Sequence, residues 1–207
     1  MNDTLFHPVN EFFDLKNPIL SNSTENDLFL KSCVWTSDRC HRVRLCKFNV
    51  KNKFYAESLV IYPDFFYDVP IFGTEYIKIG SKRFFGAIDF HPITNDKEYL
   101  KFLEMFPDKQ QIKTHAYDLN LFFSEKLWAR RRTNDFYDEY QVMLKCFLHQ
   151  YKKCLYSANK TSRSFEKQQE KYNVYMKTND PAHGILKSYF GEDFAKEYID
   201  NFLFFNK

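Results

Sequence analysis

The sequence is poor in glycine and lacks the common cofactor-binding motifs. Its 207 residues include only 5 Gly, and no GxGxxG stretch is present to form the phosphate-binding turn of a dinucleotide fold. The cysteines are Cys33, Cys40, Cys46, Cys146 and Cys154, an odd number without a CxxC pair. This spacing predicts reduced thiols rather than a disulfide framework, a zinc site or an iron–sulfur cluster. The six His are scattered without metal-ligand spacing, so no metal site is predicted.

Long apolar runs and long runs of one charge are also missing. The first residues, MNDTLFHPVNEFFDL, contain early acidic residues and no sustained apolar segment, which argues against a signal peptide or a membrane span. The net charge of +3 is too small to indicate a nucleic-acid partner by itself. We expect a single cytoplasmic domain over residues 1–207, monomeric and without nucleic-acid or membrane partners.

Aromatic residues are abundant instead. The chain has 24 Phe and 14 Tyr, far more than an average globular protein of this length. Such rings pack against one another in a core, and they also form walls for a flat conjugated ligand. Composition alone favours core packing for any single ring.

Four segments after Arg42 have the composition of short strands. They read RVRLCKFNV, KFYAESLVIYP, TEYIKIG and RFFGAIDFHP. Gly80 and Ser81 form a connection short enough for a hairpin, which predicts antiparallel pairing. Side chains alternate between the two faces along the second segment. One face carries Phe54, Ala56, Ser58 and Val60, and the other carries Tyr55, Glu57, Leu59 and Ile61, so both faces include apolar residues. Both faces of the sheet should therefore be covered.

Helices are predicted mainly in the second half. Apolar residues recur at helical spacing from Phe136 to Leu155, with Asn134 as N-cap, and again after Pro181 as far as Phe202. A more polar helix is expected from Ser162 to Lys177. The N-terminal part, up to about Asp38, suggests an amphipathic element followed by a loop. The predicted fold is an α+β three-layer sandwich, with a central antiparallel β-sheet flanked by helices on both sides.

Four acidic residues occur in segments where the side chain need not be exposed to water: Glu57, Glu75, Asp89 and Asp180. A carboxyl among apolar groups keeps its proton to higher pH and can donate it to a bound base. Spacing alone favours structural roles for these acids. Asp180 precedes Pro181 and suits a turn or helix cap, and Asp89 suits a hydrogen-bonded structural position.

The run Trp128-Ala129-Arg130-Arg131-Arg132 combines guanidinium groups with an indole. Guanidinium groups bind carboxylates and phosphates with two parallel hydrogen bonds. The run therefore fits an anion-binding site, and a solvated charged turn fits it as well.

Three segments together resemble the ferredoxin-dependent bilin reductases. The first runs from Asp68-Val69-Pro70-Ile71-Phe72-Gly73-Thr74-Glu75 to Ala87-Ile88-Asp89-Phe90-His91-Pro92, similar to that family's D-[LV]-P-x-F-G-x-[DE] and A-x-D-[LF]-x-P motifs. The second is FFSEKLWARRR, and the third is NDPAHGILKSYFGEDFAKEYIDNFLF. The resemblance covers most of the chain after about Lys53.

The resemblance implies an enzyme that reduces biliverdin IXα, or 15,16-dihydrobiliverdin, without a bound cofactor. Single electrons would come from the [2Fe-2S] cluster of reduced ferredoxin, while protein carboxyls supply protons. The matching acids are Glu75 and Asp180. Substrate-binding residues implied by the matching segments are Ser58, Phe72, Asp89, Ser124, Trp128, Arg130 and Arg132.

Two departures bear on the product. Members of the family that make phycocyanobilin carry His at the position matching Ser58 and Asp at the position matching Glu75. A serine hydroxyl cannot hold the positive charge that an imidazole can. The resemblance therefore favours phycoerythrobilin as the product, with phycocyanobilin as the alternative. The compact, Lys/Asn/Phe-rich sequence is similar to phage-encoded members, which would work in a host cytoplasm.

Two other classes of function stay open. A non-catalytic bilin carrier would use the same aromatic pocket without needing the acids. A nucleic-acid-binding module would stack bases on Phe and Tyr and bind oligonucleotides in a strongly salt-dependent way.

Overall fold

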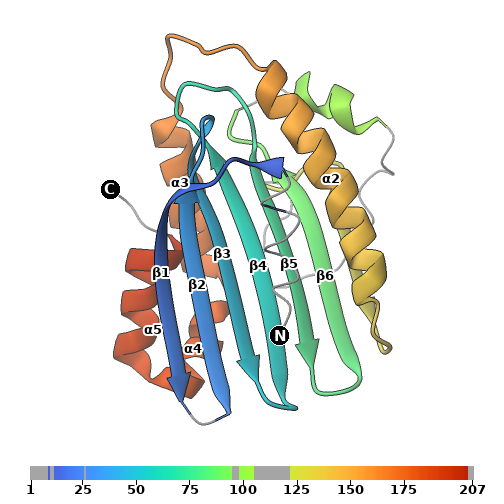
Figure 1. Cartoon of the computed structure of the whole chain (residues 1–207), viewed down its shortest axis with the longest axis vertical. Coiled ribbons are helices and arrows are strands. Elements are labelled where there is room, and N and C mark those ends of the chain that lie inside the picture. Colours follow the sequence, from blue (N-terminus) through green and yellow to red (C-terminus); the bar gives the residue numbers. More distant parts are fainter. Residues whose placement is uncertain (1–8, 10–11, 26, 95–97, 105–121, 205–207) are drawn as a thin grey trace.

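Seven strands form one antiparallel sheet, and they follow one another across it in chain order (Figure 1). The computed structural model describes residues 9, 12–25, 27–94, 98–104 and 122–204. The strands are β1 Lys16–Glu25, β2 Leu28–Thr36, β3 Cys40–Val50, β4 Phe54–Pro63, β5 Ile71–Ile79, β6 Arg83–His91 and β7 Trp128–Arg132. The predicted antiparallel sheet is confirmed. The hairpin between β5 and β6 turns at Gly80, whose φ of 60° is easily reached only by glycine.

The prediction of a loop before Asp38 is wrong, because β1 and β2 occupy this part of the chain. The predicted amphipathic element before it lies mostly outside the described residues. β1 is an edge strand, and no further strand in the described part of the chain pairs with its outer side. A proline, which lacks a backbone N–H, is therefore tolerated at Pro18, and so is a polar sequence after Leu20. In β2, Leu28 and Leu30 are buried in the same cluster as the C-terminal helices. The alternation in LFLKSCVWT was the signal for this strand.

One face of the sheet is covered by α2, Tyr137–Ser157, which crosses it over β5 and β6 (Figure 1). The apolar spacing predicted this helix, and the residues on its inner stripe are fully buried: Tyr140, Leu144, Phe147, Leu148, Tyr151 and Leu155. Asn134 is not the N-cap. The helix begins after Phe136, and the side chain of Asp135 accepts the backbone N–H of Tyr137 at 3.0 Å. A short 3₁₀ helix, η1, spans Glu98–Leu103.

The opposite face is covered near β2 and β3 by the C-terminal helices (Figure 1). These are α3 Glu166–Asn179, α4 Ala182–Phe190 and α5 Glu192–Tyr198, followed by a π-helical turn, η2, at Ile199–Leu203. The predicted single helix after Pro181 is interrupted at Gly191. Its φ of 87° directs the chain into α5, and a side chain would strain this conformation.

Strand alternation separates the two cores. Leu59 and Ile61 pack beneath α2, whereas Phe48 packs with Leu186 and Leu203 of the C-terminal helices. The three-layer sandwich is therefore confirmed. No helix among the residues described is long and apolar enough to cross a membrane.

Candidate active site

A cavity of about 960 Å³ lies between the sheet and the C-terminal helices. Its floor is the sheet face that carries Ser58, Glu75 and Ala87, and the α3–α4 junction contributes Asp180 and Pro181 to its wall. The volume lies at the upper end of the range for ligand pockets, roughly 300–1,000 Å³. Aromatic and aliphatic side chains line much of it, among them Phe48, Phe54, Ile77, Phe85, Tyr198 and Phe204. This lining suits a large, flat, mainly apolar ligand.

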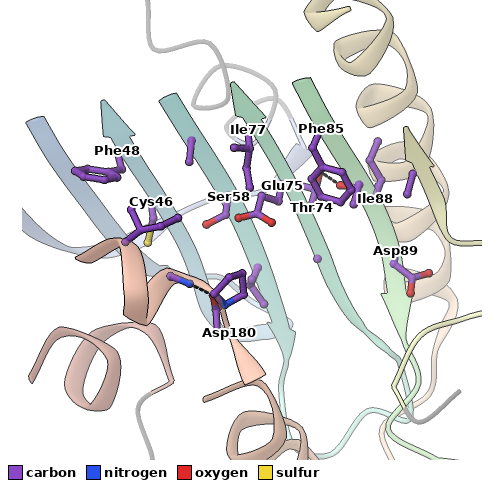
Figure 2. A pocket seen from close by; sticks show the side chains of 18 of the residues that line it. Cys46, Phe48, Ser58, Thr74, Glu75, Ile77, Phe85, Ile88, Asp89 and Asp180 are labelled. Carbon is purple, nitrogen blue, oxygen red and sulfur yellow. Dashed lines mark hydrogen bonds between the residues drawn. The ribbon is translucent and has the colours of Figure 1, made fainter. Parts of the chain in front are cut away.

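Glu75 lies near the middle of the sheet. It pairs across the strands with Ser58 on β4 and Ala87 on β6, both on the cavity face. Figure 2 shows the side chains of Ser58 and Glu75 next to each other on adjacent strands. Alternation along β5 puts Ile77 and Ile79 on the same face as Glu75, and all three line the cavity.

Asp180 ends α3 and faces the same cavity from the opposite wall (Figure 2). Its Oδ1 accepts the backbone N–H of Ala182 at 2.8 Å, and its own N–H donates to the carbonyl of Met176. The turn-forming role weighed from the sequence is thus present. It does not exclude a chemical role, because the carboxyl still lines the cavity.

The two carboxyls affect one another's protonation. Burial, and then the nearby charge of Asp180, raise the pKa of Glu75 to about 8, against an opposing effect of Arg44. Burial also raises the pKa of Asp180, opposed by the Ala182 N–H and by Arg44. Glu75 therefore holds a proton at neutral pH, as a proton donor must.

Arg44 supplies a buried positive charge beside these acids. It projects from β3 to the cavity side, is 4% exposed and lies with its guanidinium carbon 5.2 Å from the centre of the Phe204 ring. Its Nη1 donates to the carbonyl of Leu203. The charge favours the ionised form of both carboxyls, so it limits how far burial raises their pKa values.

Asp89 and Ser124 form a structural pair at one end of the cavity. Asp89 lines the cavity, but its carboxylate accepts the backbone N–H of Ser124 at 2.9 Å and also the Ser124 hydroxyl. Ser124 itself is buried and is not part of the lining. The hydrogen-bonded structural role open for Asp89 is therefore present, and Ser124 ties the segment before β7 to β6 rather than facing a ligand.

Positive side chains gather at another part of the cavity. Arg131 on β7 lines it together with Lys82 and Arg83 from the β5–β6 hairpin. Arg132 borders the cavity, but its guanidinium lies on the α2 face, where it forms an ion pair of 2.8 Å with Glu139 and lies over the Phe136 ring. This group could hold ligand carboxylates, as was predicted for the arginine run.

Three predicted substrate contacts need correction because alternation turns them to the α2 face. Phe72 is fully buried against Phe90 and Tyr151. Trp128 packs among the aromatic residues of the α2 core, and Arg130 lies over the Trp128 ring. None of the three lines the cavity.

Glu57 is also on the α2 face. It is 1% exposed, and its carboxylate accepts hydrogen bonds from the hydroxyls of Tyr55 and Tyr137, at 2.5 and 2.6 Å. This acid belongs to the core beneath α2 and has no contact with the cavity.

Sequence reasoning missed several cavity residues, namely Arg44, Cys46, His91 and Tyr198. For Arg44 and Cys46 a signal existed, since alternation in RVRLCKF puts both on one face with Phe48. A charged residue within an apolar strand is rarely buried without a function or partner. In the part of the chain that the structure describes, no group of three or more His, Cys, Asp or Glu could hold a metal ion.

The fold is a three-layer sheet-and-helix domain with a large cavity that two acids of raised pKa, Glu75 and Asp180, line from opposite walls. Comparison with known proteins gives the family. The model of the ferredoxin-dependent bilin reductases matches residues 10–205, so the chain belongs to this family. It is accordingly an oxidoreductase that reduces bilins with electrons from ferredoxin.

Relatives agree with this assignment. The 15,16-dihydrobiliverdin:ferredoxin oxidoreductase of Prochlorococcus marinus is 28% identical over 200 residues, which cover 88% of this chain and 82% of that protein. The enzyme of the same name from Nostoc punctiforme is 25% identical over 93% of this chain and 88% of its own length. Tomato phytochromobilin synthase, solved in complex with biliverdin, has the same fold, with a TM-score of 0.79 at 17% identity over 100% of this chain and 86% of that chain.

Proposed function

We propose that this enzyme reduces biliverdin first at the 15,16 bridge and then at the A-ring diene, giving phycoerythrobilin. Each of the two reductions takes up two electrons, delivered singly by ferredoxin, and two protons. Glu75 and Asp180 are the proton donors, and each takes up a new proton from solvent after it has delivered one. The observation that carries the proposal is that these acids line one cavity from opposite walls, with raised pKa values.

The cavity supports an open-chain tetrapyrrole as the ligand. Its volume of about 960 Å³ is large for a pocket, and the aromatic rings on its floor and walls suit a conjugated pigment. The bilin propionates would be held by the basic group of Lys82, Arg83 and Arg131. We further propose that the chain binds no cofactor of its own, since reduced ferredoxin brings the iron–sulfur cluster.

The choice of the bonds that are reduced rests on Ser58 and on the names of the relatives. Ser58 lies beside Glu75 where phycocyanobilin-forming members have His, and its hydroxyl cannot become cationic. This favours reduction away from the D-ring vinyl group. The relatives are named for 15,16-dihydrobiliverdin, which fits chemistry at the 15,16 bridge.

The test is anaerobic incubation of the protein with biliverdin, ferredoxin and a system that reduces ferredoxin, followed by chromatography of the bilins. We expect 15,16-dihydrobiliverdin to appear first and phycoerythrobilin to follow. Phycocyanobilin as the product would overturn the regiochemistry. Bound biliverdin with unchanged absorbance over time would indicate a carrier instead. Supplying 15,16-dihydrobiliverdin directly tests whether the second reduction belongs to this enzyme.

A further inference from the structure

His91, at the end of β6, has a fixed orientation in the cavity. The side chain is 5% exposed, lines the cavity and contacts the rings of Phe123 and Tyr172, with centroid distances of 5.1 and 5.0 Å. Its Nδ1 is 3.0 Å from the carbonyl oxygen of Phe122. Because a carbonyl oxygen only accepts hydrogen bonds, Nδ1 carries the ring proton. In the neutral ring, Nε2 therefore has a lone pair.

The ring is neutral at physiological pH. Burial lowers the pKa of His91 to about 4, against the opposing effect of the Phe122 carbonyl. The nearest acid, Asp89, has its Oδ2 3.7 Å from Nδ1 and is hydrogen-bonded by Ser124. His91 is therefore a hydrogen-bond acceptor at Nε2 and not a proton donor.

Gly73 makes room for this nitrogen. A Cβ at Gly73, on the cavity face of β5, would lie 2.3 Å from Nε2, so any other residue would displace the imidazole. Among the residues that the structure describes, Nε2 has no hydrogen-bond partner. His91 lines the cavity, so an acceptor there without a protein partner is suited to a donor on the ligand.

The acceptor lies at a different place from the acids. Gly73 precedes Glu75 by two residues on the same strand face, a separation of about 7 Å along the strand. A ligand ring that meets His91 Nε2 is therefore not the ring that meets Glu75.

We propose that His91 Nε2 accepts a hydrogen bond from a pyrrole or lactam N–H of the open-chain tetrapyrrole, on a ring neighbouring the one that meets Glu75 and Asp180. This inference rests on the proposed bilin substrate. The hydrogen bond would stop the pigment from sliding along the strands, and so it would help to decide which carbon lies next to each acid. Gly73 acts through His91 as a positioning residue.

Nitrogen NMR of the wild-type protein tests the state of the ring directly. With ¹⁵N-labelled histidine, we expect His91 Nε2 to have the chemical shift of an unprotonated imidazole nitrogen near neutral pH, and to move upfield when biliverdin binds. The signal is assigned by its loss in His91→Gln. A protonated Nε2, or an Nε2 shift that biliverdin leaves unchanged while absorbance shows binding, would overturn the inference and leave the proposed function standing.

Matched substitutions give a second measurement. His91→Phe keeps a ring and removes the acceptor, so we expect about tenfold weaker biliverdin binding and a mixture of reduction products, whereas His91→Gln, which offers an acceptor oxygen, should recover part of both. His149→Phe, an exposed position on α2, is the control and should bind as wild type does. Wild-type affinity and a single product in His91→Phe would refute the role. Failure of the wild-type protein to bind biliverdin would instead refute the proposed function.

Discussion

Replacing Glu75 by glutamine should change the pH dependence of stability. Between the ordinary pKa of 4.5 and the value of about 8 in the cavity, the folded protein keeps a proton that the unfolded chain has lost. Stability therefore falls as pH rises through this window and is constant above and below it. At about 1.4 kcal/mol per pH unit, the full effect is about 5 kcal/mol. Because the carboxyl is partly open to the cavity, screening by water reduces this change in the free energy of unfolding, and we expect a change of about 2–5 kcal/mol.

Glutamine cannot ionise, so this loss should be absent in Glu75→Gln. Urea unfolding at pH 5, 7 and 9 should give a variant about as stable as wild type at pH 5 and more stable than wild type at pH 9. Glu170→Gln, an exposed position on α3, is the control and should follow the wild-type curve. A constant difference between Glu75→Gln and wild type at all three pH values would refute the argument that burial protonates this acid.

Three other substitutions test separate parts of the structure. Gly191→Ala should lower the free energy of unfolding by about 1–2 kcal/mol, because φ is 87° there; unchanged urea denaturation would contradict this. Arg44→Gln removes the charge that favours ionised Asp180, so the alkaline limb of the pH–rate profile should move to higher pH; a move to lower pH would contradict the electrostatics. Glu57→Gln should lower the free energy of unfolding by about 1–3 kcal/mol, because its carboxylate accepts the Tyr137 hydroxyl, without changing the bilin product; a changed product would contradict its place outside the cavity.

Strand periodicity predicted much of the fold because the central strands are apolar and alternate. The side chains of β4 divide between the two faces as expected, and this put Ser58 on the face that became the cavity floor. β1 was missed because an edge strand does not need an apolar pattern or every backbone donor, so Pro18 and its polar neighbours look like a loop.

The candidate site was only partly predictable, since a short motif does not tell which face of a strand a residue occupies. Glu75 and Asp180 were found from their motifs, and the structure brings them to one cavity. Phe72 belongs to the same motif as Glu75, but it is three residues away on the strand and therefore on the other face. His91 becomes visible as a site residue only in the assembled fold, because its neighbours Phe122 and Tyr172 come from distant segments, whereas strand alternation already gave a signal for Arg44.

The most direct test of the account is turnover by Glu75→Gln and Asp180→Asn under anaerobic conditions with biliverdin and reduced ferredoxin. Both variants should bind the pigment, as its visible spectrum reports, and accept an electron. Without the proton donor the bilin radical should persist in electron paramagnetic resonance, and the final product should not form. Product formation at the wild-type rate in both variants would contradict the claim that these two carboxyls protonate the bilin.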